Sequence, residues 1–545
     1  MEFQTLKELY ANSINTYGSR SAFSMLGRES MTYNDFDDRV DYVRGILLGA
    51  GLSSGDKVAL LSSNMPNWNV CYFAIVTSGM VAVPILPDFS GPELDAIIAH
   101  SDAKALMVSD KLFSRLSRET IDRMNIVIRT KNLGILSRKS GALGVMREPK
   151  PDDLAVIIYT SGTTSAPKGV MLTHYSLARQ IQMGRDLFAV LPDDVFLSIL
   201  PLSHTYECSL GMLLPFMCGA SVVYIDRPPT ASNLLPALRE VRPTIMLSVP
   251  LIIEKIYKSQ VANRFGSSPF LRALYARPFF RKMIHRTIGK RLYELFGGRL
   301  RFFGIGGAKL DAEAERFLLE GRFPYAIGYG LTETAPLLAG ATPDKVRLGS
   351  TGPMLKGVEA RLEDVNELGE GELVVKSPCT MQGYYKNPEL TAEVFTHDHW
   401  FRTRDLAAFD NDGYLYIKGR LGNMILGPNG ENIYPEDIES VLNSHFLVSD
   451  SIVQEENGKL IALVHFDREQ LRKRYQELRH DMAEIKAELI RYVNAKVNKS
   501  SKIASIREQE EAFEKTPSHK IKRYLYTSQH KKTAQPNNRM QTKEV

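Results

Sequence analysis

The chain has 545 residues, which is more than a single hydrophobic core holds, so we expect at least two domains. Charged residues make up 24% of the sequence and hydrophobic residues 44%, which is ordinary for a folded, soluble protein. The formal net charge of +6 is a weak basic excess, and no repeat of interleaved basic and aromatic residues accompanies it, so we expect no nucleic-acid partner.

Residues 1 to about 150 alternate helical patterns with short apolar runs, such as "KVALLSS" (57–63) and "MVAVPIL" (80–86). The alternation continues as far as "PTIMLSVP" (243–250). Fully apolar strands separated by helices are typical of parallel sheets that are covered on both faces. The first residues contain early acids and no apolar run, which argues against a signal peptide. We therefore predict an α/β fold of layered sheets.

The longest uncharged run is "CSLGMLLPFMCGASVVYI", residues 208–225. A membrane-spanning helix needs about 20 apolar residues, and Gly211, Pro215 and Gly219 interrupt this run. The run ends in a β-branched segment. It therefore predicts a buried helix followed by a buried strand.

The four cysteines lie far apart in the sequence, and no two of them have C-x-x-C spacing. This spacing predicts reduced, buried thiols in a cytoplasmic protein, without a disulfide framework or a zinc site. We expect none of them to act in catalysis. They are Cys71, Cys208, Cys218 and Cys379.

Around 350–420 the pattern changes to turn-rich, β-like segments, and a smaller α+β unit begins near 421. Its expected elements include a strand, "KLIALVHF", and a long charged helix near 467–498. The last residues are polar and poor in apolar groups, which is typical of disorder. The predicted parts are a large domain of layered α/β sheets with a β-rich portion (1–420), a small α+β domain (421–526) and a disordered tail (527–545).

The segment "YTSGTTSAPKGVMLTH", residues 159–174, joins two apolar strands and is rich in Gly, Ser and Thr. It is not a Walker P-loop, because Pro167 replaces the second glycine and Gly169 replaces the residue that would bind magnesium. Its hydroxyls, its glycines and the charge of Lys168 still suit the phosphates of a nucleotide. For this segment alone, a simple polar turn is the alternative.

The first part of this segment, "YTSGTTSAPKGV", resembles the signature of the adenylate-forming superfamily, which includes acyl-CoA synthetases, firefly luciferase and peptide-synthetase adenylation domains. Four further segments resemble motifs of that family in the same order: "PLSHTYE" (201–207), "GYGLTET" (328–334), "WFRTRDLAAFDNDGYLYIKGR" (400–420) and "KTPSHKIKR" (515–523). The resemblance implies that a carboxylate attacks ATP to form an acyl-adenylate and pyrophosphate. It also implies a C-terminal domain that moves between the two half-reactions.

Two segments look like the long-chain fatty acyl-CoA synthetase branch: "PTIMLSVPLIIEKIY" (243–257) and "IGKRLYELFGGRLRFFGIGGAKL" (288–310). The resemblance implies a fatty acid, ATP and coenzyme A as substrates, Mg2+ as the cofactor and no obligatory protein partner. Three alternatives stay open: a fatty acyl-AMP ligase that loads a carrier protein, a peptide-synthetase adenylation domain and a catalytically silent adenylate-binding protein.

The resemblance assigns the catalytic roles. Lys520 neutralises charge at the α-phosphate, Glu333 binds Mg2+ together with Thr164, Thr332 contacts the α-phosphate, and His204 lies near the acyl channel. Without the resemblance, Glu333 and Lys520 would be read as solvated charges and His204 as a core histidine. Lys515 and Lys522 are distinguished from Lys520 only by the resemblance.

For ATP or AMP, the resemblance implies that Tyr329 faces the adenine, that Asp405 accepts hydrogen bonds from the ribose diol and that Arg420 assists it. For the last two residues, a surface ion pair is the alternative. Asn423 occupies the hinge position. The full nucleotide set is Thr160, Ser161, Gly162, Thr163, Thr164, Lys168, Gly307, Ala308, Gly328, Tyr329, Gly330, Thr332, Asp405 and Arg420.

Four residues depart from the family pattern. Ser165 and Arg404 stand where glycine is usual, Asn423 stands where Asp or Lys is typical, and His519 stands where many relatives have glycine. We expect the first two to bear on the affinity for ATP.

The segment 271–296, "LRALYARPFFRKMIHRTIGKRLYELF", predicts a basic amphipathic helix that lies on an anionic membrane surface. The alternative is a solvated helix face that packs on its own domain, because Pro278 interrupts the run and Glu294 opposes its charge. The basic residues are Arg272, Arg277, Arg281, Lys282, Arg286, Lys290 and Arg291.

Overall fold

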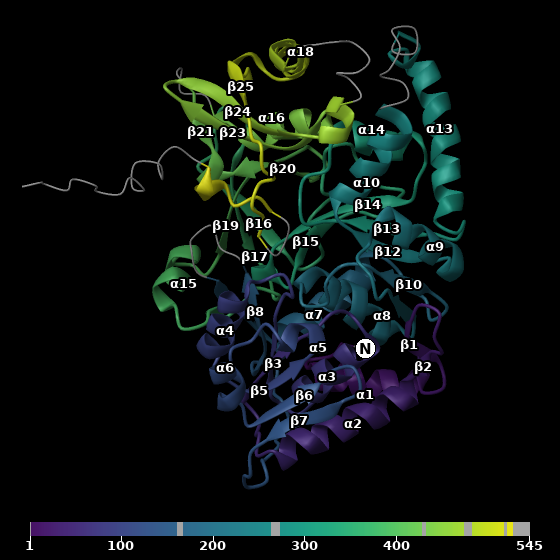
Figure 1. Ribbon diagram of the computed structural model, residues 1–545, viewed down its shortest axis with the longest axis vertical. Coiled ribbons are helices and arrows are strands. Elements are labelled where there is room, and N and C mark those ends of the chain that lie inside the picture. Colours follow the sequence, from purple (N-terminus) through teal and green to yellow (C-terminus); the bar gives the residue numbers. More distant parts are fainter. Residues whose placement is uncertain are drawn as a thin grey trace, which may run out of the picture. The chain divides into compact units, whose positions relative to one another are not determined.

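The computed structural model describes residues 2–160, 167–262, 273–427, 432–472, 482–516 and 520–526. Figure 1 shows the order of its helices and strands. The chain divides into two compact units at Leu421 and Gly422. Unit 1 contains the described residues before this division, and unit 2 contains those after it. The motion expected of the smaller part stays a prediction, and the predicted tail lies outside the described residues.

The described residues of unit 1 form two eight-stranded sheets. In the first sheet, the neighbouring pairs from β14 to β1 are parallel, and the edge strands are antiparallel. The carboxyl ends of its parallel strands therefore lie at one edge. Its order is β15 (Leu337–Gly340), β14 (Tyr325–Gly330), β13 (Phe302–Ile305), β12 (Ile245–Ser248), β10 (Val195–Ser198), β11 (Ser221–Tyr224), β1 (Ser21–Met25) and β2 (Met31–Thr32).

The second sheet has a parallel centre between β8 and β6, and the strands on either side are antiparallel. Its apolar strands include the predicted runs at 57–63 and 80–86, so both runs are confirmed as buried strands. Its order is β18 (Gly383–Tyr384), β9 (Lys168–Thr173), β8 (Leu154–Thr160), β4 (Val81–Pro84), β3 (Lys57–Leu61), β5 (Ala103–Val108), β6 (Ile126–Arg129) and β7 (Gly134–Arg138).

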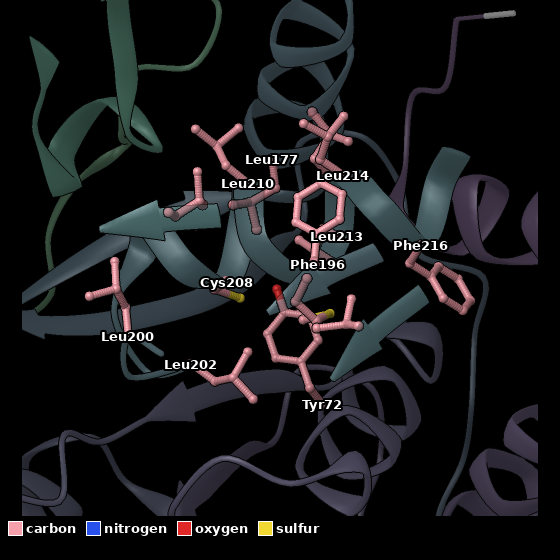
Figure 2. Packing of buried hydrophobic residues seen from close by; sticks show 14 of the residues in the cluster. Tyr72, Leu177, Phe196, Leu200, Leu202, Cys208, Leu210, Leu213, Leu214 and Phe216 are labelled. Carbon is pink, nitrogen blue, oxygen red and sulfur yellow. The ribbon is translucent and has the colours of Figure 1, made fainter. Parts of the chain in front are cut away.

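Helix α3 (Pro66–Thr77) contacts strands of both large sheets, β1 in the first and β3 and β4 in the second. Every residue from Asn67 to Thr77 is buried, as expected for a helix that is apolar on all sides. Figure 2 shows Tyr72 of this helix beside Cys208, Leu202 and Phe196 in the core. The helix therefore joins the two sheets through one continuous hydrophobic core.

The uncharged run forms a π-helix, η1 (Glu207–Leu213), then α8 (Leu214–Cys218) and strand β11. These elements are almost entirely buried, so the expected helix followed by a strand is confirmed. No helix in the described part of the chain is long and apolar enough to span a membrane.

The β-rich portion of unit 1 is a four-stranded antiparallel sheet. Its strands are β16 (Glu359–Glu363), β17 (Gly371–Lys376), β19 (Phe401–Phe409) and β20 (Leu415–Arg420). Further helices of unit 1 are α1 (Leu6–Tyr17), α2 (Tyr33–Gly49), α4 (Gly91–His100), α5 (Asp110–Phe113), α6 (Arg118–Arg123), α7 (His174–Leu187), α9 (Ala231–Val241), α10 (Pro250–Tyr257), α13 (Pro278–Leu295), α14 (Ala312–Glu320) and α15 (Pro388–Val394).

Unit 2 has its own core, in which α16 (Pro435–Ser444) and α18 (Met482–Asn494) pack with a three-stranded sheet. The helix predicted near 467–498 is described only in part, because residues 473–481 lie outside the described ranges. The three-stranded sheet contains β23 (Val448–Glu456), β24 (Lys459–Phe466) and β25 (Ser505–Glu508), and a separate two-stranded sheet contains β21 (Ile425–Leu426) and β22 (Asn432–Ile433).

Candidate active site

The loop that resembles a phosphate site begins and ends on paired strands. Strand β8 ends at Thr160 and β9 begins at Lys168, and these two residues lie directly opposite each other. The Lys168 ammonium lies 5.7 Å from the centre of the Tyr384 ring, a cation–π distance. The predicted loop residues Ser161, Gly162, Thr163 and Thr164, and the departure Ser165, lie outside the described residues.

A tight return of the chain presents Thr332 and Glu333. Strand β14 ends at Gly330, a short 3-10 turn (Thr332–Thr334) follows, and the chain re-enters the sheet as β15. A Cβ at Gly330 would lie 1.8 Å from the carbonyl oxygen of Pro336, so the return accepts only glycine there. Thr332 and Glu333 are half-buried on this turn.

Tyr384 brings Glu333 and Lys168 into one group. Its hydroxyl donates a hydrogen bond to Oε1 of Glu333 at 2.8 Å, and its ring lies beneath Lys168. Burial and the charge of Glu333 raise the pKa of Tyr384. Burial and the positive charge of Arg404 lower the pKa of Lys168, whereas Glu333 raises it. Sequence reasoning missed Tyr384, because it lies outside every recognised motif.

Asp405 joins the first large sheet to the four-stranded sheet. Its Oδ2 accepts a hydrogen bond from the hydroxyl of Tyr329 at 2.7 Å, and its Oδ1 lies 2.9 Å from Nε of Arg420. Asp405 and Arg420 are register partners on β19 and β20. The Asp405 charge raises the pKa of Arg420, and burial raises that of Tyr329. The residues predicted for adenine and ribose are thus in direct contact.

Further residues of the predicted nucleotide and acyl site lie at the carboxyl-terminal edge of the first sheet. Gly307 and Ala308 follow β13 and are exposed, and Gly307 has a φ of 88°. Gly328 lies near the end of the parallel neighbour β14, and His204 follows β10 in the same sheet. This edge is where α/β proteins commonly bind ligands.

His204 is half-buried and is held in one tautomer. Its Nδ1 accepts the backbone N–H of Tyr206 at 3.3 Å, so Nε2 carries the proton of the neutral ring. The Tyr206 ring packs on Gly304 and Gly306, next to the exposed Gly307. In this tautomer, Nε2–H is a hydrogen-bond donor.

Glu207 is a buried acid that sequence reasoning treated only as part of a motif. It begins η1, and the hydroxyl of Ser198, at the end of β10, donates to its Oε1 at 2.5 Å. Burial raises the pKa of Glu207 to about 8. A Cβ at Gly211 would lie 2.6 Å from the carboxyl carbon, so this glycine leaves room for the acid. In the sequence, the signal that could have identified Glu207 was a single acid directly before an apolar run.

In unit 2, the candidate lysine lies in a short loop. Lys520 is exposed, its N–H donates to Oγ1 of Thr516, and its carbonyl accepts the N–H of Thr516. Its two competitors form ion pairs: the Lys515 ammonium lies 2.9 Å from Asp450, and that of Lys522 lies 3.8 Å from Glu514. His519 lies outside the described residues.

At the predicted hinge, the side-chain amide of Asn423 donates to Oε1 of Glu436 on α16, at 2.6 Å. Both residues belong to unit 2. Asn423 thus contacts the first helix of unit 2 directly after the division of the chain.

All four cysteines are buried, and burial raises the pKa of each thiol to about 12. A thiol with so high a pKa supplies almost no thiolate, the form that reacts with electrophiles. Among the described residues, no cluster of His, Cys, Asp and Glu could by itself hold a metal ion.

A family model described as "AMP-binding enzyme" matches residues 10–385. The chain is 29% identical over 488 residues to long chain acyl-CoA synthetase 1 of Arabidopsis thaliana, which covers 79% of this chain and 73% of that protein. It is also 29% identical over 466 residues to the long-chain-fatty-acid–CoA ligase FadD15 of Mycobacterium bovis, with coverage of 78% and 75%.

Solved structures of the o-succinylbenzoate-CoA synthetase of Bacillus subtilis share the fold. The TM-score is 0.76 for its complex with an acyl-adenylate intermediate and 0.75 for its complex with ATP and a magnesium ion. At 21% identity, the alignments cover 95% of this chain and 98% of that one. The predicted α/β architecture is confirmed.

Glu207 predicts a specific pH dependence of stability. Its pKa is raised from 4.5 to about 8 in the fold, so its stabilising contribution is complete below pH 4.5 and is lost as pH rises through 8. Glu207→Gln keeps an acceptor for Ser198 and does not titrate. We expect its free energy of unfolding, measured with denaturant, to rise relative to wild type across this interval. Exposed Glu119→Gln is the control, and parallel curves for Glu207→Gln and wild type would contradict the assignment.

Proposed function

Because the chain belongs to the AMP-binding enzyme family, we propose that it is an acid–thiol ligase that activates a long-chain fatty acid for transfer to coenzyme A. In the first step, the fatty acid and ATP give acyl-AMP and pyrophosphate. In the second step, the coenzyme A thiol takes the acyl group and AMP leaves. The observation that carries this proposal is the grouping of Lys168, Glu333, Tyr384, Asp405 and Arg420 within unit 1, in a chain related to long-chain acyl-CoA synthetases.

The chemical barrier is electrostatic, because an anionic carboxylate must approach the polyanionic phosphates. Lys168 and Lys520 supply positive charge at the phosphates, and His204 donates Nε2–H to the fatty acid carboxylate. Asp405 orients the ribose beside Tyr329. The backbone around the nucleotide is formed by six predicted residues: Thr160, Gly307, Ala308, Gly328, Gly330 and Thr332. No covalent enzyme intermediate is needed, in keeping with four buried cysteines.

Glu333 fits a magnesium ion that arrives with ATP. Mg2+ commonly binds one or two carboxylates together with substrate phosphates rather than a cage made wholly of protein. Tyr384 holds one carboxylate oxygen of Glu333 and fixes its orientation. When bound, the ion would neutralise phosphate charge.

Glu333→Gln keeps the shape of the side chain and an acceptor for Tyr384 but removes the charge. We expect pyrophosphate release at low magnesium to fall by orders of magnitude and to recover in part at high magnesium, because the ion is then bound by phosphates alone. Glu119→Gln on α6 is the matched control. Normal magnesium dependence of Glu333→Gln would remove Glu333 from the metal site.

Pyrophosphate release with ATP and a series of fatty acids tests the function, and thioester formation with free coenzyme A tests the acceptor. We expect Lys520→Ala to lose adenylate formation and to keep nearly full thioester formation from supplied acyl-AMP, because its charge serves only the first step. Lys522→Ala, which removes a lysine already paired with Glu514, should retain both steps. Equal loss of both steps in Lys520→Ala would refute its role.

Helix α13 supports a peripheral contact with anionic membranes, which we propose for a protein located in the cytoplasm. The structure corrects one detail of the predicted face: Arg281 lies 2.8 Å from Glu320 of α14 and packs within unit 1. The side chains of Phe279 and Met283 are 73% and 53% exposed on the same face as three basic residues. These are Lys282, Arg286 and Lys290. Pro278 begins this helix, and residues 276–277 before it are not helical, so the predicted run 271–296 is interrupted there, as the alternative expected.

Sedimentation with anionic phospholipid vesicles tests this contact. Each basic residue near such a surface contributes about 1 kcal/mol, so changing Lys282, Arg286 and Lys290 together to Gln should abolish binding at low salt. The control variant removes the same number of positive charges elsewhere on unit 1, by changing the exposed residues Lys111, Arg118 and Arg123 to Gln. Equal loss in both triple variants, or no binding by wild type at low salt, would contradict the role of α13.

A further inference from the structure

Arg404 has a backbone conformation that favours glycine. Its φ is 59°, in the left-handed region, although it lies within strand β19. The residues on either side, Thr403 and Asp405, are buried, so the surrounding sheet holds this conformation in place. Glycine, the usual residue at this position of the resembled motif, would adopt it without steric cost. Such strain in a non-glycine residue occurs most often at functional sites.

The ion pair that Arg404 forms with Glu393 in the described part of the chain does not explain the strain. Its Nη2 lies 3.3 Å from Oε2 of Glu393 on α15, and the two side chains are 50% and 62% exposed. An ion pair this exposed adds little to stability. For the stability of the fold alone, an arginine at this position is therefore less favourable than a glycine.

The charge of Arg404 acts on the candidate phosphate site. Together with burial it lowers the pKa of Lys168. The contacts on α15 agree with this placement: Thr391, two residues before Glu393, accepts the N–H of Tyr384 through its hydroxyl. Tyr384 in turn contacts Glu333 and lies beneath Lys168.

Lys168 and Arg404 come from two different sheets, and their like charges repel each other. Glu333 and Glu393 offset part of this repulsion at Lys168, and a polyanion between the two cations would relieve the rest. Arginine is suited to such a ligand, because its planar guanidinium can donate two parallel hydrogen bonds to one phosphate.

We propose that Arg404 is a phosphate-binding residue that contacts the phosphate chain of ATP together with Lys168. This inference rests on the proposed function of the same site. It assigns a binding role to a residue that replaces glycine, so that this chain holds ATP through a contact that a glycine cannot make.

The test uses two measurements on the full-length protein that should move in opposite directions. Arg404→Gly removes the strain, so its midpoint of denaturant unfolding should be equal to or higher than that of wild type. Its KM for ATP should rise by roughly 10- to 100-fold, the loss expected for a charge-assisted hydrogen bond, with a smaller change in kcat. Inorganic pyrophosphate should inhibit the variant more weakly. Arg404→Asn, which tolerates the left-handed region, serves if the glycine variant does not fold.

Glu393→Gln is the matched control, because it breaks the ion pair and leaves Arg404 in place. We expect its KM for ATP to be equal to or lower than that of wild type. If Arg404→Gly and Glu393→Gln raised KM equally, or if Arg404→Gly left KM and pyrophosphate inhibition unchanged in an active enzyme, the inference would be wrong and the proposed function would stand. A wild-type protein that releases no pyrophosphate with any fatty acid would instead refute the proposed function.

Discussion

A buried carboxylate, that of Asp405, is the constraint on which the candidate site depends. Its charge is tolerated in the interior because Tyr329 donates a hydrogen bond to one oxygen and Arg420 pairs with the other. These two partners come from different sheets, β14 of the first large sheet and β20 of the four-stranded sheet. The electrostatic requirement of one acid therefore fixes the two sheets against each other, and with them the surfaces that would face adenine, ribose and phosphate.

The rest of the site extends from this junction by short links. The turn that follows Tyr329 presents Glu333, and Tyr384 connects Glu333 to Lys168 on the second large sheet. Three sheets of unit 1 thus contribute to one polar group, while α3 joins the two larger sheets through buried apolar side chains and a hydrogen bond from Asn69 to Tyr224 of β11. Mainly apolar packing determines where the two larger sheets lie, and a few polar contacts determine which side chains meet at the edges of the three sheets.

Much of this could be predicted from sequence, because apolar runs and ordered motifs are local signals. The strand at 57–63, the helix and strand after Cys208 and the adenylate-forming family were all predicted in this way. Contacts between distant segments could not be predicted: Tyr384 lies 51 residues from Glu333 and in no motif. In α13, the charge pattern did not reveal that Arg281 faces an acid on another helix. The burial of Glu207 likewise follows from packing on β10.

The return of the chain at Gly330 also bears on how this sequence can change over time. Every single-base change of a glycine codon that alters the residue adds a side chain or stops translation, and a Cβ at this position would meet the carbonyl of Pro336. The position is therefore closed to one-step evolutionary drift, whereas the nearby Arg404 shows that a conformation suited to glycine elsewhere in the site has accepted a long side chain. Steric exclusion at Gly330 and backbone strain at Arg404 thus restrict substitution to different degrees within one site.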